Sequence, residues 1–192
     1  MIKIGITGGI GSGKSVVGEL LTLYGVPVYI ADTEAKRLTN TSETIRKELI
    51  SLFGKDLYSG TELDKKKLAS FIFKDPQLLQ TTNQIIHPEV GKHFQNWASR
   101  QNGTICAIES AILFESGFDS LVDKTLTVFA PEELRIKRAA NRDKTAEDAI
   151  RQRMKNQLAE EIKKERSDFV IHNDGHTALI PQVHAILSAL NQ

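Results

Sequence analysis

The first 30 residues contain two kinds of hydrophobic pattern in succession. Ile2, Ile4 and Ile6 form a β-branched run, which predicts a short buried strand. Valine and leucine then recur at helical spacing from residue 16 to 23, which predicts a helix. Gly25 ends that helix, and the apolar residues 26–30 predict a second strand.

Helix signals alone fill the next part of the chain, from residue 42 to 101. Ser42 and Asp64 are suitable N-cap residues ahead of apolar residues at helical spacing, and Asp75 precedes a proline at a first helical position. The His-Pro pair at 87–88 interrupts the last pattern, so we expect a separate helix after it. A crossover between parallel strands needs only about a dozen residues, so the block is predicted to be an inserted helical subdomain.

Three further strands are predicted downstream. Apolar and β-branched residues mark them at 104–109, 125–129 and 169–171. A terminal amphipathic helix from residue 179 to 190 is expected to pack on the sheet. Together with the two strands at the start, these segments predict an α/β fold with a five-stranded parallel sheet flanked by helices.

The segment between the first strand and the first helix carries the strongest chemical signal. Residues 8–15, GGIGSGKS, match G-x-x-x-x-G-K-[ST], the phosphate-binding P-loop. Glycines let backbone N–H groups close around phosphate oxygens, and the helix N-terminus adds unpaired donors and partial positive charge. A glycine-rich turn without a ligand is the alternative. The match at every fixed position, with strand and helix on the correct sides, favours a P-loop NTPase core.

A P-loop predicts binding of a nucleoside triphosphate with Mg²⁺. Lys14 is expected to reach the β- and γ-phosphates, and the Ser15 hydroxyl is expected to ligate Mg²⁺. The residues expected to bind the phosphates are Gly9, Ile10, Gly11, Ser12, Gly13, Lys14, Ser15 and Val16.

Asp32 directly follows the second strand. Ligands of open parallel sheets bind beyond the carboxyl ends of the strands, so this carboxylate is expected in the neighbourhood of the P-loop. Asp32 is also a suitable N-cap for a helix at 34–38. The two roles are compatible, and the position favours a functional one.

The stretch from residue 132 to 157 is rich in arginine and lysine. A helix begins near Pro131, and residues 145–148 resemble a capping box that starts another. Arg138 and Arg142 are four residues apart and share a helix face, which suits contact with one polyanion. A solvated surface is the alternative. The excess of basic over acidic residues favours a lid that closes over the triphosphate.

Length, charge and cysteine content indicate the size of the fold, the cellular location and the kinds of partner to expect. The length of 192 residues suits one α/β core with an inserted subdomain, and the net charge of +1 argues against a nucleic-acid coat protein. Cys106 is the single cysteine, which favours a reducing compartment. No apolar stretch approaches membrane-spanning length, and the chain enters its first strand without room for a signal peptide. We therefore expect a cytoplasmic protein with small-molecule substrates and no nucleic-acid, membrane or protein partner.

Three classes of P-loop protein compete. A GTPase switch typically carries N-K-x-D after a late strand, but residues 172–175 are HNDG. A motor ATPase would be expected to have a clear Walker B aspartate and a longer chain. A small-molecule kinase must enclose two substrates and exclude water, and the helical block and the arginine-rich hairpin fit that need best. Another small-molecule or nucleoside-monophosphate-type kinase, or a nucleotide-dependent switch, stays as an alternative.

Several short segments, in order along nearly the whole chain, resemble one kinase family. They are residues 7–15, 31–32, 86–90 and 112–117, the spacing of Arg138 and Arg142, and residues 153–157 and 168–175. This ordered set is similar to that of the dephospho-coenzyme A kinases, the last enzymes of coenzyme A synthesis. The resemblance implies ATP-dependent phosphorylation of the ribose 3′-hydroxyl of dephospho-coenzyme A, giving coenzyme A and ADP.

The resemblance also implies roles for individual residues. The catalytic residues are Asp32, Lys14, Arg138 and Arg142, and the substrate-binding residues are Asp32, His87, Leu113 and Glu115. Asn173 would lie near the adenine. The sequence pattern predicts a nucleotide-binding core at 1–40, 102–131 and 158–192, a helical acceptor-binding insert at 41–101, and the arginine-rich lid at 132–157.

The chain departs from the family pattern at a few positions. Ile30 stands where the family often has the first of two aspartates, and Gly91 stands where an arginine is common. Glu109 and Ala111 replace a usual aspartate and proline. Glu109 keeps a carboxylate at a strand end, where it could bind a Mg²⁺-coordinated water.

Overall fold

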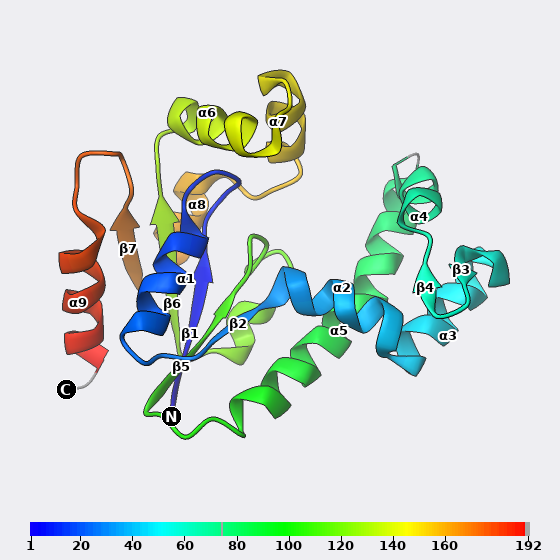
Figure 1. Ribbon diagram of the computed structural model, residues 1–192, viewed down its shortest axis with the longest axis horizontal. Coiled ribbons are helices and arrows are strands. Elements are labelled where there is room, and N and C mark those ends of the chain that lie inside the picture. The colour runs from blue at the N-terminus through cyan, green and yellow to red at the C-terminus, as the bar shows by residue number, and fades with distance from the viewer. Residues whose placement is uncertain (74, 191–192) are drawn as a thin grey trace. The chain divides into compact units, whose positions relative to one another are not determined.

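The computed structural model describes residues 1–73 and 75–190 and divides the chain into two compact units. The first unit contains residues 1–30 and 98–192, and the second contains residues 31–97. Figure 1 shows the elements of both units. The insert predicted at 41–101 therefore overlaps a compact unit that begins earlier, at residue 31, and ends at residue 97.

A five-stranded sheet forms the centre of the first unit. Its strands are β1 (Ile2–Thr7), β2 (Val28–Ile30), β5 (Ile105–Glu109), β6 (Lys124–Phe129) and β7 (Phe169–His172). They pair in the order β2-β5-β1-β6-β7, and every pair is parallel. The predicted parallel sheet is confirmed.

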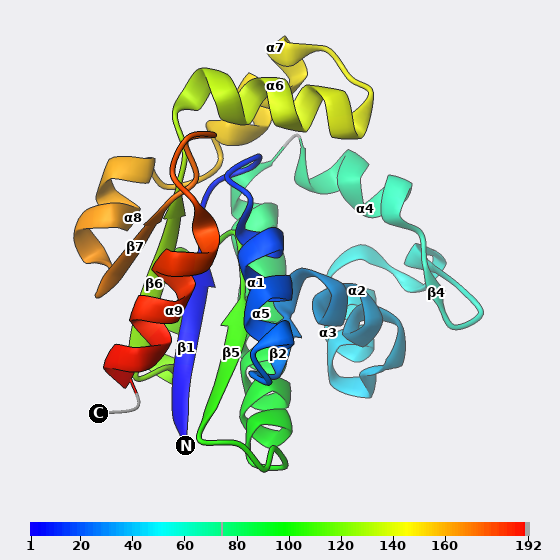
Figure 2. The same cartoon turned by 60° about the vertical axis from the view of Figure 1, so that its left-hand side comes forward.

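Helices cover both faces of this sheet, as Figures 1 and 2 show together. The helices of this unit are α1 (Lys14–Leu23), α6 (Glu132–Asp143), α7 (Glu147–Met154), α8 (Glu160–Arg166), α9 (Leu179–Leu190) and the 3₁₀ helix η2 (Phe118–Leu121). α1 and α9 pack side by side on one face, and α8 packs against β6 on the other. The helices α6 and α7 lie beyond the carboxyl ends of the strands.

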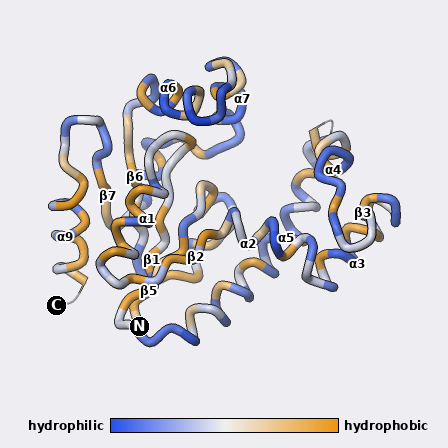
Figure 3. The backbone as a smooth tube through the Cα atoms, in the orientation of Figure 1, coloured by the Kyte–Doolittle hydropathy of each residue, from blue (hydrophilic) through white to orange (hydrophobic). Residues whose placement is uncertain are grey.

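The apolar residues of the strands and of α1 and α9 form one core. In Figure 3 the strands of this sheet are mostly orange, the colour of hydrophobic residues. Buried residues of the core include Ile4, Ile6, Val17, Leu21, Leu126, Val128, Ile171 and Val183. Strands buried on both faces are rich in isoleucine, leucine and valine, which explains why the first strand could be read directly from the sequence.

The second unit is mostly helical. Its elements are α2 (Ala31–Thr41), α3 (Glu43–Phe53), η1 (Lys55–Leu57), β3 (Tyr58–Ser59), β4 (Glu62–Leu63), α4 (Lys65–Ile72) and α5 (Pro76–Ala98). The predicted caps form: the Ser42 side chain accepts a hydrogen bond from Ile45 N, and the Asp64 side chain accepts one from Lys67 N. Asp75 Oδ1 likewise accepts from Gln77 N at 2.8 Å.

Two predictions for this unit were wrong. Residues 58–63 form a small antiparallel hairpin where only helices were expected, because strands of two residues are too short to show alternation. The expected break at 87–88 is absent, since α5 continues through Pro88. Proline removes one helical hydrogen bond, but burial of Val90 and Phe94 on the following turns favours continuation of the helix.

The capping box expected at residues 145–148 does not form. α7 begins at Glu147, one residue later than a capping box at 145–148 would place it, its N-cap is Ala146, and no side chain caps the helix. Lys144, at the C-cap of α6, takes a left-handed conformation with φ of 49°, so the backbone itself makes the turn.

Asp168 joins the start of β7 to the start of β6. Its carboxylate accepts hydrogen bonds from Thr125 N at 2.8 Å, from Thr125 Oγ1 at 2.9 Å and from Lys124 Nζ at 3.0 Å. Burial raises the pKa of Asp168, but the Thr125 amide and hydroxyl and the Lys124 ammonium together hold it below its usual value. The folded state therefore favours the ionised carboxylate.

We expect Asp168→Ala to lower the free energy of unfolding at pH 7, because the hydrogen bonds from Thr125 and Lys124 are lost. The loss should be only roughly 1 kcal/mol, because solvent screens this partly exposed group. The lowered pKa means that the stabilisation is present above the unfolded-state pKa of about 3.9 and is lost as the pH falls below it. Urea unfolding at pH 7 and pH 3 should show a smaller difference between wild type and variant at pH 3. Asp148→Ala, on the exposed side of α7, is the control, and an equal difference at both pH values would contradict the account.

Candidate active site

The P-loop connects β1 to α1, and its shape requires glycine at positions that include Gly11 and Gly13. Gly11 has φ of 79° and Gly13 has φ of 90°, both in the left-handed region. A Cβ atom on Gly11 would lie 2.1 Å from the carbonyl oxygen of Arg135, and one on Gly13 would lie 2.1 Å from Asn173 Nδ2. These glycines are therefore needed both for the turn and for the close approach of neighbouring groups.

Asn173 connects the loop after β7 to the P-loop. Its side-chain Nδ2 donates to the Ser12 carbonyl oxygen at 2.8 Å, and its backbone N donates to the Phe129 carbonyl oxygen at 2.8 Å. Arg138 Nη1 donates to the Asn173 carbonyl oxygen at 2.9 Å. Three predicted site residues, Ser12, Arg138 and Asn173, thus form one connected group.

The loop that carries Asn173 is itself fixed by Asp174. The Asp174 carboxylate accepts hydrogen bonds from Thr177 N at 2.8 Å and from His176 N at 2.9 Å. These amides lower the pKa of Asp174 to about 2. The loop therefore keeps a charged, hydrogen-bonded turn at neutral pH.

Ser15 and Glu109 bring two oxygen ligands together at the edge of the sheet. Ser15 Oγ donates to Glu109 Oε1 at 2.9 Å. Glu109 is the last residue of β5, is 6% exposed, and pairs with Ile6 of β1 in the strand register. A hydroxyl and a carboxylate at this spacing suit a hard cation such as Mg²⁺, which is usually bound by few protein oxygens together with phosphates and water.

The hairpin of α6 and α7, which the sequence predicts to be a lid, packs directly on the P-loop. Ile10 contacts an apolar cluster formed by Ile136, Ala139 and Ile150 of α6 and α7. Arg135, which the sequence did not single out, is buried and donates from Nε to the Ala130 carbonyl oxygen at 3.1 Å. Its position was not predictable, because burial of an arginine depends on the tertiary contacts of α6.

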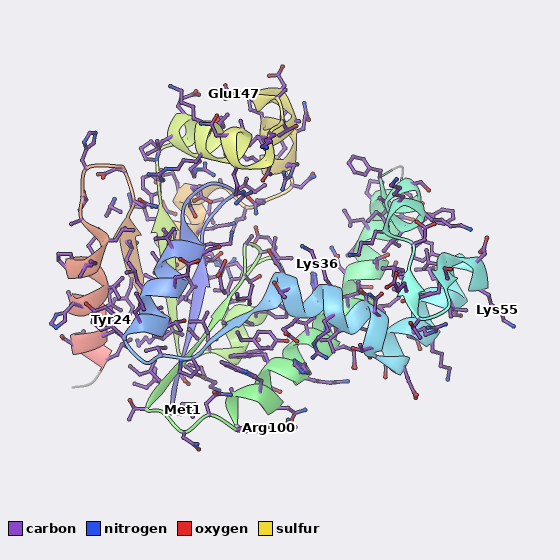
Figure 4. All side chains as sticks on the ribbon, in the orientation of Figure 1. Met1, Tyr24, Lys36, Lys55, Arg100 and Glu147 are labelled. Atoms are coloured by element: carbon purple, nitrogen blue, oxygen red, sulfur yellow. The ribbon has the colours of Figure 1, made fainter. Side chains whose placement is uncertain are left out.

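Arg142 has a different environment from Arg138. Its Nε donates to Asp143 Oδ1 at 2.8 Å, and Arg153 Nη1 reaches the other oxygen of the same carboxylate at 2.6 Å. These two arginines lower the pKa of Asp143 to about 2. Glu147, labelled in Figure 4, is exposed at the start of α7 on the same hairpin. Contact between Arg142 and phosphate stays a prediction.

Two predicted substrate-binding residues belong to the first unit. Leu113 is fully buried, and its side chain packs closely on Gly5 of β1, since a Cβ atom on Gly5 would lie 2.7 Å from Leu113 Cδ2. The Leu113 side chain is therefore part of the core. Glu115 Oε1 accepts a hydrogen bond from Leu158 N at 2.7 Å and lies 3.4 Å from Lys163 Nζ. Contact of either residue with a substrate stays a prediction.

Asp32 and His87 belong to the second unit. Asp32 is exposed in the first turn of α2, which begins at Ala31, so it lies inside the helix rather than at the N-cap. Asp32 lies two residues after Ile30, the last residue of β2, and Ile30 pairs with Glu109 of β5. His87 lies in α5, and burial lowers the pKa of its imidazole.

The strand, loop and helix with the G-K-S sequence, on a parallel sheet, define a nucleotide-binding protein of the P-loop class. No helix in the described part of the chain is long and apolar enough to cross a membrane.

Known proteins identify the family within this class. The sequence model of the dephospho-CoA kinases matches residues 2–178. Dephospho-CoA kinase of Bacteroides fragilis is 49% identical over 192 residues, covering 100% of this chain and 94% of the relative. The enzyme of Porphyromonas gingivalis is 47% identical over 191 residues, covering 99% and 95%. The crystal structure of TT1252 from Thermus thermophilus is 35% identical, with a TM-score of 0.83, over 99% of this chain and 96% of that one.

The chain belongs to the dephospho-CoA kinase family. The resemblance found in the sequence is thereby confirmed, and neither a different small-molecule kinase nor a nucleotide-dependent switch is favoured.

We expect Asn173→Ala to weaken ATP binding about tenfold, because the nucleotide must then order a P-loop that has lost its partner at Ser12. Titration calorimetry with ATP and Mg²⁺ measures the effect, and a thermal melt checks folding. Asn141→Ala, an exposed asparagine of α6, is the matched control. Equal dissociation constants for the two variants would show that Asn173 does not support the P-loop.

Proposed function

We propose that this chain transfers the γ-phosphoryl group of ATP to the ribose 3′-hydroxyl of dephospho-coenzyme A, giving coenzyme A and ADP. Membership of the dephospho-CoA kinase family supports this reaction. The observation that carries it is the P-loop cradle, closed by Asn173 at Ser12 and by α6 at Gly11. The cradle leads into α1 at Lys14, and N–H groups in the first turn of a helix are suited to binding phosphate oxygens.

The P-loop binds the triphosphate and stabilises the charge that develops during transfer. Backbone N–H groups of residues 11–16 hold the β-phosphate, and Lys14 reaches the β- and γ-phosphates. Phosphoryl transfer depends mainly on positioning and charge stabilisation, so a fixed lysine at this point contributes directly to the rate. Arg138 and Arg142 of the lid supply further positive charge to the transferring group.

Ser15 and Glu109 would hold Mg²⁺, the second proposed cofactor. Their oxygens are already within 2.9 Å of one another, which is the arrangement that a shared cation or its bound water requires. The ion would neutralise charge on the β- and γ-phosphates. Ser15 would contribute its hydroxyl oxygen, and Glu109 would orient a water molecule bound to the ion.

The second unit would bind dephospho-coenzyme A. Asp32 accepts the proton of the 3′-hydroxyl, whose oxygen then bonds to the γ-phosphorus as the bond to the ADP oxygen breaks. His87 would shape the acceptor site within this unit. Contact of Leu113 and of Glu115 with a substrate is proposed separately. Because a ribose hydroxyl is a poor nucleophile when protonated, a carboxylate that accepts its hydrogen bond both orients and activates it.

A cytoplasmic location fits this chemistry. The single thiol, Cys106, is buried, and burial raises its pKa, so it is a core group rather than a nucleophile. The substrates are small molecules, and the proposed reaction needs no protein partner.

An ADP-release assay tests the proposed function. With ATP and Mg²⁺, we expect ADP release to depend on dephospho-coenzyme A and to be absent with shikimate or a nucleoside monophosphate. Removal of Mg²⁺ by chelation should abolish the release. Equal ADP release with and without any acceptor would contradict the proposal and indicate an ATPase.

Asp32→Asn should fold normally and bind ATP with little change, yet lose kcat by about 10²-fold or more, because asparagine cannot accept a proton. Steady-state kinetics, an ATP titration and a thermal melt on this variant give the three readouts. Glu34→Gln, which removes a carboxylate from the same first turn of α2, is the control and should keep kcat. Unchanged kinetics in Asp32→Asn would place the base elsewhere.

A further inference from the structure

One side chain, Gln157, touches both the P-loop and the segment that follows β5. Gln157 lies in the connection between α7 and α8, where the lid returns to the sheet. Its Oε1 accepts a hydrogen bond from the backbone N of Ile10 at 3.1 Å. Its Nε2 donates to the Ala111 carbonyl oxygen at 3.4 Å. The two ends of one amide therefore join two segments at the carboxyl edge of the sheet.

The Ala111 carbonyl is held from a second direction by Lys163 of α8. Lys163 is fully buried, and its Nζ donates to the Ala111 oxygen at 2.8 Å. Glu115 and Glu160 provide the negative charge near this ammonium, at 3.4 Å and 3.9 Å. A buried ammonium is costly unless it is paired and hydrogen-bonded, so this group is held firmly in one place.

The neighbouring residue adds another connection between the same two segments. The backbone N of Leu158 donates to Glu115 Oε1 at 2.7 Å. Residues 157 and 158 thus bind the segment after β5 at both Ala111 and Glu115. On the other side, Ile10 packs its side chain into the lid cluster of Ile136, Ala139 and Ile150. The lid, the front of the P-loop and the segment after β5 consequently meet at Gln157.

We propose that Gln157 is a positioning residue for phosphoryl transfer, which aligns the front of the P-loop with the segment after β5 when the lid is in place. The role rests on the proposed function. Gln157 contacts Ile10 and not the helical residues Lys14 and Ser15, which carry the expected grip on the β-phosphate and Mg²⁺. Its loss should therefore disturb alignment for transfer much more than it disturbs ATP binding.

The separate roles of Gln157 in alignment and of Lys14 and Ser15 in ATP binding predict a specific kinetic pattern. Gln157→Met keeps the length of the side chain and removes both hydrogen bonds. We expect kcat with dephospho-coenzyme A to fall about tenfold, since small misplacements of reacting groups have large effects on rate. The ATP dissociation constant should change by less than about threefold, because the loss of one neutral hydrogen bond to the P-loop has a modest effect.

The experiment compares Gln157→Met with Gln152→Met, which removes an exposed glutamine from α7 of the same lid. Three quantities are measured on both variants and on wild type: kcat, the ATP dissociation constant, and the hydrogen-exchange rate of the Ile10 amide. The exchange rate needs no acceptor, so it separates failure of the present proposal from failure of the proposed function. In Gln157→Met the Ile10 amide should exchange at least about tenfold faster than in wild type, because it has lost its acceptor.

A fall in kcat with retained ATP binding and faster Ile10 exchange, seen only in Gln157→Met, supports the positioning role. The proposal is overturned if kcat and Ile10 exchange are unchanged in Gln157→Met. It is also overturned if ATP binding falls in parallel with kcat, since Gln157 would then support the nucleotide cradle as a whole.

Discussion

The P-loop is rich in glycine, and its shape depends on hydrogen bonds from groups outside it. Asn173 Nδ2 binds the Ser12 carbonyl, and Gln157 Oε1 binds the Ile10 amide, so one contact fixes each half of the loop. Glycine has many unfolded conformations to lose, and a loop that had to be ordered by ATP itself would bind ATP more weakly. The contact from Asn173, in the loop after β7, therefore sets the half of the loop next to α1 in the form that phosphate requires, whereas the contact from Gln157 fixes the front of the loop at Ile10.

Charge around the cradle is arranged in two different ways. Lys163 is fully buried and is held by the Ala111 carbonyl and by nearby carboxylates, so it acts as a fixed part of the fold. Arg142 is exposed and is paired with Asp143, a contact that solvent screens and that a polyphosphate could replace at little cost. Fixed charge suits the scaffold of the site, whereas exchangeable charge suits a lid.

The sequence predicted the features that depend on local patterns. The P-loop was identified because its residues are contiguous, and the five strands because each is a short apolar run. Local patterns could not predict the continuation of α5 through Pro88, since packing of Val90 and Phe94 decides it. They also could not show that Asn173 binds Ser12, because these residues are 161 positions apart. The ordered family segments pointed to Asn173, but only the fold reveals its partner.

A crystal structure with a non-hydrolysable ATP analogue and Mg²⁺ tests the central claim, that the P-loop is already shaped for phosphate. We expect the β-phosphate to receive hydrogen bonds from the backbone N–H groups of residues 11–16, with the bond between Asn173 and Ser12 retained. An analogue bound away from these amides would contradict the account. So would a bound state in which the P-loop has refolded and Asn173 has released Ser12.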